Sequence, residues 1–179
     1  MAKKKSREPE EVNCEGDPSP MIDCCFLLLM FFIVNASQIT VSKDPSVNMP
    51  HAVSASEMKD ANGCIVVNVF ADPDVMGAKN PKALEKFNQT YAAYPGTVWG
   101  VADASQNSIG YNSGQSQQLS EFITKQREAM EAKGIKPEMI RLYLRGDADA
   151  PWSRSSGAIR AAAAAGVSNI VFGSLPAEN

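Results

Sequence analysis

The sequence is poor in the side chains that most often bind metal ions or act as catalytic bases and nucleophiles. Its 179 residues include one histidine and four cysteines, and no two cysteines have the Cys-x-x-Cys spacing of a zinc ligand pair. The histidine, His51, lies in a polar stretch with no cysteine nearby. We therefore expect no zinc site, no other cofactor and no enzyme built on a nucleophile and a histidine base.

The chain also lacks an excess of basic charge. It has 17 Lys and Arg against 20 Asp and Glu, which gives a net charge of −3. Domains that bind nucleic acid carry a strong basic excess, so we expect no nucleic-acid partner. The apolar fraction of 44% is that of an ordinary globular domain with a core.

Only one long apolar run is present, which excludes a transporter with many spans. Residues 21–34 read MIDCCFLLLMFFIV and carry a single charge, Asp23. Extended to its uncharged limits, the run covers residues 19–39. About 20 residues at a rise of 1.5 Å cross the ~30 Å hydrocarbon core of a bilayer. We therefore predict a transmembrane helix over residues 19–39.

The basic residues on either side of this run predict its orientation. Four basic residues lie in the 18 residues before the predicted span: Lys3, Lys4, Lys5 and Arg7. Only Lys43 lies in the 18 residues after it. Lys and Arg remain on the cytoplasmic side of a membrane helix. The N-terminus is therefore predicted to be cytoplasmic, with the rest of the chain across the membrane.

Two alternatives for the apolar run are a cleaved signal peptide and a buried helix. Val34 and Ala36 are small residues that suit a cleavage site. However, five acidic residues precede the run, and an aspartate and two cysteines lie within it, unlike a simple signal peptide. A buried helix is disfavoured because residues 26–34 are apolar on every side.

The rest of the chain divides into three parts. Residues 1–18 are charged and have no apolar period, so we predict a cytoplasmic tail. Residues 40–62 are predicted to be a linker with one short extended piece at Val47–Pro50. Residues 63–179 are predicted to form a small α/β domain.

Periodicity and helix start and stop signals predict the elements of this domain. Runs of strand length occur at 64–70, 97–101, 109–111, 139–145 and 170–174. Helical patterns occur at 80–94, 116–133 and 151–165. Asn80 and Pro81 supply a cap and a first-turn proline, and Gly134 ends the second helix.

Asp23 is the leading candidate for function. A charged side chain at the centre of a membrane helix costs about 2.5–3.5 kcal/mol, so Asp23 should face protein or water rather than lipid. Burial favours the neutral form of a carboxyl group, and a proton relay needs a carboxyl that takes up and releases a proton. An aspartate that reaches the headgroups or caps the helix start remains the alternative.

The residues around Asp23 resemble the transmembrane signature of the ExbD/TolR family, the small stator subunits of proton-driven motors in the bacterial inner membrane. The matching residues are Pro20, Ile22, Asp23 and the apolar run from Phe26 onward. The segment Val47–Pro50, VNMP, resembles the Val-Asn-Leu-Pro piece that follows the span in this family. The resemblance covers about residues 18–50 and 115–176.

The C-terminal third resembles the same family, whose tail reads strand, Arg-x-Asp, Pro-aromatic, helix, Ala-Gly and strand. The residues in these places are Arg145, Asp147, Pro151, Trp152, Ala165 and Gly166. Two stretches depart from the family pattern. Residues 72–95 look like an insertion with an extra helix, and residues 102–113 are longer than the usual hairpin.

The resemblance implies a fold and a function. The fold would be an ExbD/TolR-like periplasmic domain with a mixed sheet and two or three helices. Asp23 would be the proton carrier in a dimer of this chain, surrounded by a pentamer of an ExbB/TolQ-like multi-span channel subunit. A TonB- or TolA-like transmitter would receive the energy. The competing function is a membrane-anchored periplasmic binding or scaffold module whose helix is only a tether.

Three smaller features have structural interpretations. Cys24 and Cys25 are predicted to be packing residues of the membrane helix. Cys64 is predicted to be a buried strand thiol, with an intermolecular disulfide as the alternative. Asp147 and Asp149 are predicted to shape the turn and cap before the last helix, because they lack the rest of a calcium loop.

Overall fold

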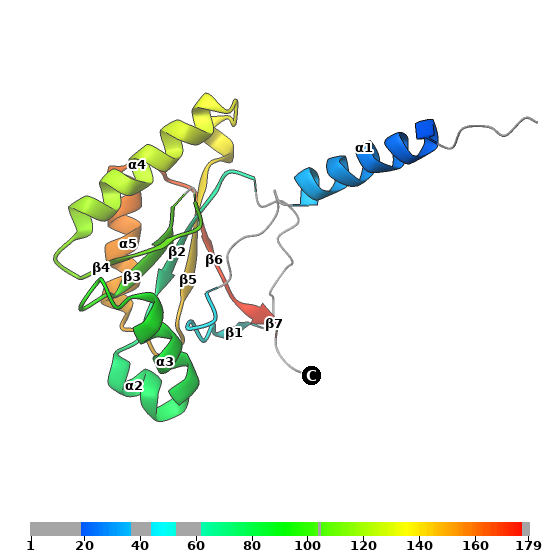
Figure 1. Ribbon diagram of the computed structural model, residues 1–179. Coiled ribbons are helices and arrows are strands. Elements are labelled where there is room, and N and C mark those ends of the chain that lie inside the picture. Colours follow the sequence, from blue (N-terminus) through cyan, green and yellow to red (C-terminus); the bar gives the residue numbers. More distant parts are fainter. Residues whose placement is uncertain (1–18, 37–43, 53–61, 104, 177–179) are drawn as a thin grey trace, which may run out of the picture. The chain divides into compact units, whose positions relative to one another are not determined.

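The computed structural model describes residues 19–36, 44–52, 62–103 and 105–176 (Figure 1). The chain forms two compact units, Met1–Thr40 and Val41–Asn179. Each unit is described by itself below.

The first unit contains one helix, α1 (Ser19–Ala36), in the region of the predicted span. A proline at the second position suits the first turn of a helix, where the missing N–H has no partner to lose. The described side chains from Met21 to Phe31 are all exposed within the unit. The last predicted residues of the span, 37–39, lie outside the described residues. None of the helices in the described part of the chain reaches the combined length and apolar character of a membrane crossing.

The second unit is built on a five-stranded mixed sheet with the order β4-β3-β2-β5-β6 (Figure 1). Three strands run parallel to one another: β2 (Cys64–Val69), β5 (Arg141–Gly146) and β6 (Ile170–Phe172). The other two continue the sheet antiparallel: β3 (Trp99–Ala102) and β4 (Ser108–Tyr111). The predicted α/β domain with a mixed sheet is therefore confirmed.

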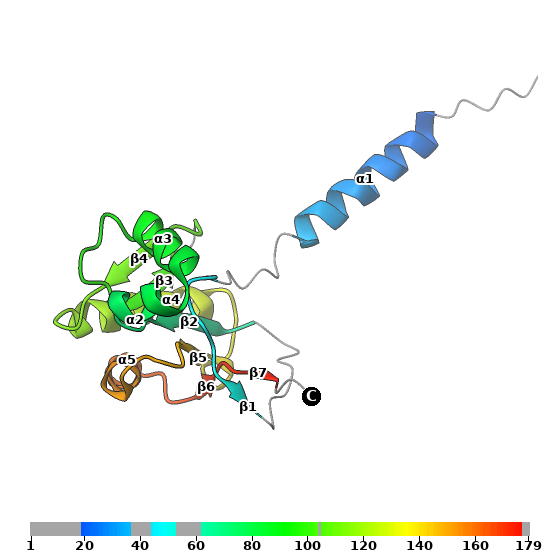
Figure 2. The same ribbon diagram turned by 90° about the horizontal axis from the view of Figure 1, so that it is seen from below.

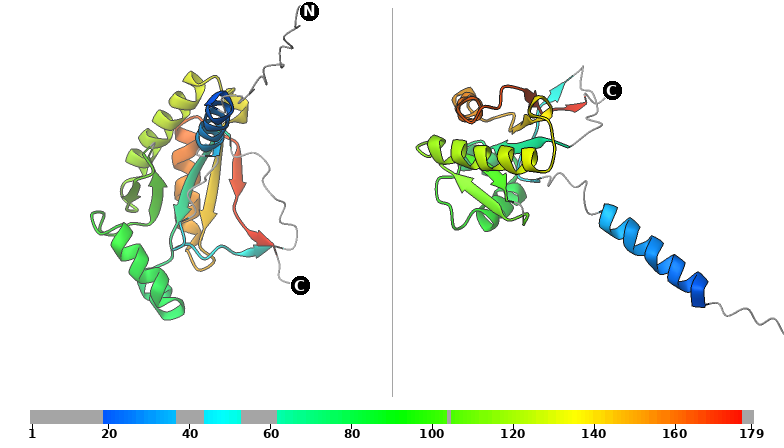
Figure 3. Two further views of the ribbon diagram at one scale, coloured as in Figure 1. Left: turned by 45° about the vertical axis from the view of Figure 1, so that its right-hand side comes forward. Right: turned by 90° about the horizontal axis from the view of Figure 1, so that it is seen from above.

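Two long helices, α4 (Ser116–Ala132) and α5 (Trp152–Ala164), pack side by side along the sheet (Figure 3). They cover one face of it, because alternate strand residues such as Val67 and Leu142 share a core with Leu119 of α4 and Ala158 of α5. This core holds most of the fully buried side chains.

A second, smaller core lies beneath α2 (Pro73–Lys79) and α3 (Pro81–Thr90), which pack against each other (Figure 2). As predicted, Asn80 caps α3, and its side chain accepts a hydrogen bond from the Ala83 N–H at 3.1 Å. The predicted helix ends earlier than Tyr94, since Tyr91 already has non-helical backbone angles.

The sequence analysis undercounted the helices. Four α-helices, α2 to α5, occur in the described part of the second unit, whereas two or three were predicted. The missed helix is α2, which is only seven residues long and contains Gly77, so it has no apolar period to detect. The strand predicted from residue 139 begins instead at Arg141, because Pro137–Met139 forms a 3₁₀ turn.

A two-stranded parallel sheet joins β1 (His51–Ala52) to β7 (Leu175–Pro176). β1 follows directly after the predicted extended piece Val47–Pro50. The pairing brings a segment near the start of the second unit against the end of the described chain (Figure 1).

Candidate functional site

Asp23 lies in the second turn of α1, and it is the only charged residue of that helix. Phe26 and Leu27 follow it by one turn on the same side, and both are exposed within the unit. The structure thus places the predicted carboxyl group on an otherwise apolar helix. Whether Asp23 carries protons is not tested by this geometry and remains a prediction.

In the second unit, residues 44–52 lie against the folded domain, and we call this segment the strap. It falls within the predicted linker. The strap passes the end of β5 and reaches β7 through β1 (Figure 1). The Leu175 N–H also donates to the Pro50 carbonyl oxygen at 2.9 Å. The strap is therefore attached along its length to the C-terminal half of the domain.

A buried polar cluster holds the start of the strap. Arg145 of β5 is only 4% exposed. Its Nη1 donates to Asn68 Oδ1 at 3.1 Å, and its Nη2 donates to the Asp44 carbonyl oxygen at 3.3 Å. The Tyr91 hydroxyl donates to Asp44 Oδ2 at 2.8 Å. These contacts join the strap to β2, β5 and the end of α3.

The pKa of Tyr91 is raised in this cluster, whereas the pKa of Arg145 is lowered. Burial raises the pKa of Tyr91 far above its ordinary value, and the negative charge of Asp44 raises it further. Burial lowers the pKa of Arg145, while the negative charge of Asp44 raises it in part. The tyrosine therefore stays a neutral hydrogen-bond donor, and it shares Asp44 with the guanidinium group.

Asp147 forms a second attachment for the strap. Its Oδ2 accepts from the Asn48 N–H at 2.9 Å, and the Ala148 N–H donates back to the Asn48 carbonyl oxygen at 2.8 Å. Its Oδ1 accepts from the Asp149 N–H at 3.0 Å, which confirms the predicted turn. The predicted cap is wrong, because Pro151 occupies the N-cap position of α5 and no side chain caps it.

The insertion predicted at residues 72–95 contributes α2 and α3, which cover the strap from another side. Val47 is only 7% exposed in the second core. Its partners there are apolar side chains of the insertion and of the end of β2: Phe70, Met76, Phe87 and Tyr91. Lys79 of α2 also forms an ion pair with Asp149 beside the strap. The insertion therefore helps to hold the strap in place.

Gly100 of β3 allows this arrangement. A Cβ atom at this position would collide with the Tyr91 hydroxyl and the Phe70 ring. Gly100 pairs with Asn68 in the sheet register, so the missing side chain makes room next to the polar cluster. A glycine inside a strand is typical of such a close approach.

His51 and three of the four cysteines lie in the described part of the chain. His51 lies in β1, and its Nδ1 is 2.9 Å from the Pro176 carbonyl oxygen. Cys64 is half-buried rather than fully buried, and its Sγ accepts from Arg141 Nε at 3.2 Å. Cys24 and Cys25 are exposed on α1. Within the described ranges, no three His, Cys, Asp or Glu side chains gather to hold a metal ion.

Sequence reasoning missed three members of the strap attachment: Asp44, Asn68 and Tyr91. It singled out Arg145 and Asp147, but their partners are far away in the chain. Tyr91 and Asp44 are 47 residues apart, and Arg145 and Asp44 are 101 apart. The one local signal was Asn68, a polar residue inside the buried run CIVVNVF, which requires a hydrogen-bond partner.

A family model described as "Biopolymer transport protein ExbD/TolR" matches residues 9–177. This range contains α1 with Asp23, the strap, the insertion and every strand of the second unit. The chain matches no curated protein and no solved structure.

Proposed function

The chain belongs to the ExbD/TolR family, and on that premise we propose that it is the small subunit of an inner-membrane complex that uses the proton-motive force to energise biopolymer transport. The observation that carries this proposal is the extent of the family match, which includes both units of the chain. A match to the domain alone would be compatible with a separate binding module. The match from residue 9 also takes in the helix that bears Asp23.

We propose that α1, extended by the uncharged residues after it, anchors the chain in the inner membrane. Support comes from the family, which is associated with that membrane, and from the apolar sequence of the helix. Its large side chains, such as Phe26 and Phe31, are exposed within the first unit and would face lipid or other helices. The N-terminal tail, with its four Lys and Arg residues, would then lie in the cytoplasm and the second unit in the periplasm.

Asp23 is the proposed proton carrier. In its neutral form the carboxyl group tolerates an apolar environment, and in its charged form it needs water or a protein partner. A proton that binds on one side and leaves on the other gains about 2.3 kcal/mol per 100 mV of membrane potential. Asp23 would couple this energy to movement of α1 against its surroundings.

One helix with one carboxyl group does not form a proton path by itself, so the proposal includes partners. An ExbB/TolQ-like multi-span channel subunit would line the path around Asp23. A dimer of this chain would lie inside a pentamer of that channel subunit. A TonB- or TolA-like transmitter would receive the energy. Family membership supports a complex of this kind, and the stoichiometry rests on the resemblance alone.

Substitution of Asp23 with Asn tests the proposal. Asn has the same shape but cannot take up and release a proton, so D23N should abolish complementation of a strain that lacks this chain. The variant protein should still accumulate in the inner membrane at normal levels. E138Q removes an exposed carboxyl group of the second unit and should complement fully. Full complementation by D23N would instead favour an anchored binding module whose helix is only a tether.

A further inference from the structure

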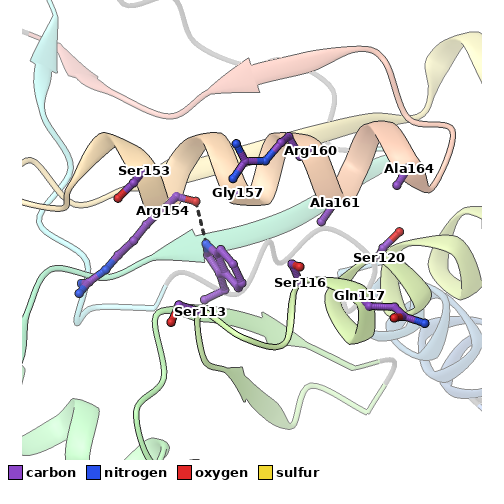
Figure 4. Close-up of a pocket in the computed structure, with 11 residues that line it drawn as sticks. Ser113, Ser116, Gln117, Ser120, Ser153, Arg154, Gly157, Arg160, Ala161 and Ala164 are labelled. Atoms are coloured by element: carbon purple, nitrogen blue, oxygen red, sulfur yellow. Dashed lines mark hydrogen bonds between the residues drawn. The ribbon is translucent and has the colours of Figure 1, made fainter.

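A groove runs between α4 and α5, and no residue of the strap lines it (Figure 4). Its volume is about 480 Å³. Three of the residues that α5 contributes to the lining are small and leave the space between the helices unfilled: Gly157, Ala161 and Ala164. Trp99 forms part of the wall, held by a hydrogen bond from its Nε1 to the Arg154 carbonyl oxygen at 2.8 Å.

Gly157 is needed for this shape. A Cβ atom on Gly157 would collide with the Trp99 ring, so a larger residue would displace the indole. Trp99 is buried and belongs to the main core. The groove is therefore a fixed feature of the packed domain rather than a gap between two loose helices.

The charged side chains that line the groove are all positive. Its neutral polar side chains are hydroxyls and one amide: Ser113, Ser116, Gln117, Ser120 and Ser153. Its charged side chains are Arg154 and Arg160, and no Asp or Glu of the described residues lines it.

Only one of the two arginines is free to bind a ligand. The Arg154 guanidinium donates from Nη1 to the Phe70 carbonyl oxygen at 2.8 Å, and its Nη2 pairs with Asp72. Arg160 is exposed and forms no ion pair with any described residue. The groove therefore offers a single uncompensated positive charge.

This chemistry favours a carboxylate as the ligand. A guanidinium group presents two parallel N–H donors that fit the two oxygens of a carboxylate, and the surrounding hydroxyls can donate to the remaining lone pairs. A phosphate monoester carries nearly two negative charges, of which one arginine would leave a large part unbalanced. Ala161, Ala164 and the Trp99 ring provide an apolar wall for a short carbon body. The volume lies in the range of small-molecule sites.

We propose that the groove between α4 and α5 binds a small carboxylate ligand, with Arg160 as its charge partner. The source of the carboxylate is either a free organic acid or the C-terminus of a peptide. This site involves none of the residues assigned to proton transfer, so it stands or falls independently of the proposed function.

Nuclear magnetic resonance titration of the full chain in detergent micelles tests the proposal. The probes are N-acetyl-Ala-Ala with a free carboxylate, the same dipeptide with a C-terminal amide, and propionate. The free dipeptide should shift the amide signals of Ser116, Ser120 and Gly157, whereas the amide form should not. Propionate distinguishes the sources: comparable binding assigns a free acid, and much weaker binding assigns a peptide C-terminus.

Variants make the test specific. R160Q should weaken binding of the free dipeptide about tenfold or more, as expected for the loss of a charge-assisted contact. R160K should restore part of it. K136Q removes one exposed positive charge outside the groove and should bind as the native chain does. A164F places a ring in the groove and should block binding.

Three results would each overturn the proposal. In the first, the free and amide dipeptides bind equally well. In the second, R160Q binds as tightly as K136Q. In the third, neither propionate nor the free dipeptide shifts the groove signals at about 10 mM, a concentration that would mostly fill a site with a Kd of about 1 mM. Because Arg160 and Lys136 are both exposed, loss of the fold would not explain a difference between their variants.

Discussion

At the scale of single residues, Asp44 is the centre of the strap attachment. Its Oδ1 accepts from the Ser46 N–H at 2.9 Å, its Oδ2 accepts from Tyr91, and its carbonyl oxygen accepts from Arg145. Each of its three oxygens therefore has a donor. Asp44 is partly buried, and a carboxylate that leaves water without donors would be destabilising, so this set of partners explains how its charge is accommodated beside an apolar core.

The raised pKa of Tyr91 predicts a specific pH dependence of stability. Below the ordinary tyrosine pKa of 10.0, the folded and unfolded chains both keep the proton. Above it, the unfolded chain loses the proton while folded Tyr91 retains it. The unfolded state is then favoured by up to about 1.4 kcal/mol per pH unit. Stability should therefore fall as the pH rises above 10.0, and Y91F should remove this part of the fall.

Urea unfolding of the purified chain between pH 8 and 11 measures this effect. Tryptophan fluorescence reports on the second unit, because both tryptophans belong to it. Tyr94 is a matched control: it is partly exposed and lies three residues away. Y94F should keep the steep alkaline loss of the native chain. Equal slopes in Y91F and the native chain would show that Tyr91 does not keep its proton in the folded state.

At the scale of elements, two parts of the second unit hold the strap: the end of β5 and the α2–α3 insertion. Arg145 and Asp147 attach it to the end of β5, in the region that resembles the family tail. The α2–α3 insertion covers it with the second core, through Val47. The polar attachment therefore sets where the strap lies, and the apolar contact from the insertion adds to its stability.

Truncation of Val47 tests the contribution of the insertion. V47A removes two buried methyl groups and should lower the free energy of unfolding by about 2 kcal/mol. It should also speed amide hydrogen exchange in residues 44–52 more than in the main sheet. V75A makes the same truncation at a partly exposed position of α2 and should have little effect. Equal exchange in the two variants would mean that the insertion does not hold the strap.

The sequence predicted the elements better than their long-range contacts. Asn80-Pro81 and Gly134 act within one turn of their helices, so the positions of α3 and α4 were predictable to within a few residues. The short helix α2 has no periodic signal. The strap attachment depends on Asp44, Tyr91 and Arg145 meeting in space, and no local pattern encodes that. Asp23 could be singled out because one charge in an apolar run is itself a local signal, and its role in proton transfer stays a prediction.

At the scale of the whole molecule, the docked strap shortens the connection between the two units. From Ala36 to Asp44 the chain has eight residue steps, which span at most about 28 Å when fully extended. With the strap detached, the connection would run from Ala36 to Cys64, about 100 Å at full extension. In the proposed complex, strap docking would therefore set how far the second unit can move from the membrane helix.

A disulfide between β1 and β7 tests whether the strap must detach from the domain for the proposed complex to function. His51 and Leu175 are register partners in the parallel pair, and neighbouring strands are close enough for a disulfide bond. In a chain whose native cysteines are replaced by Ala, H51C/L175C should lose complementation when oxidised and regain it with reductant. The single variant H51C, treated in the same way, controls for the lost histidine. If the oxidised double variant complements fully, the second unit does its work with the strap docked, and the shorter connection is the functional one.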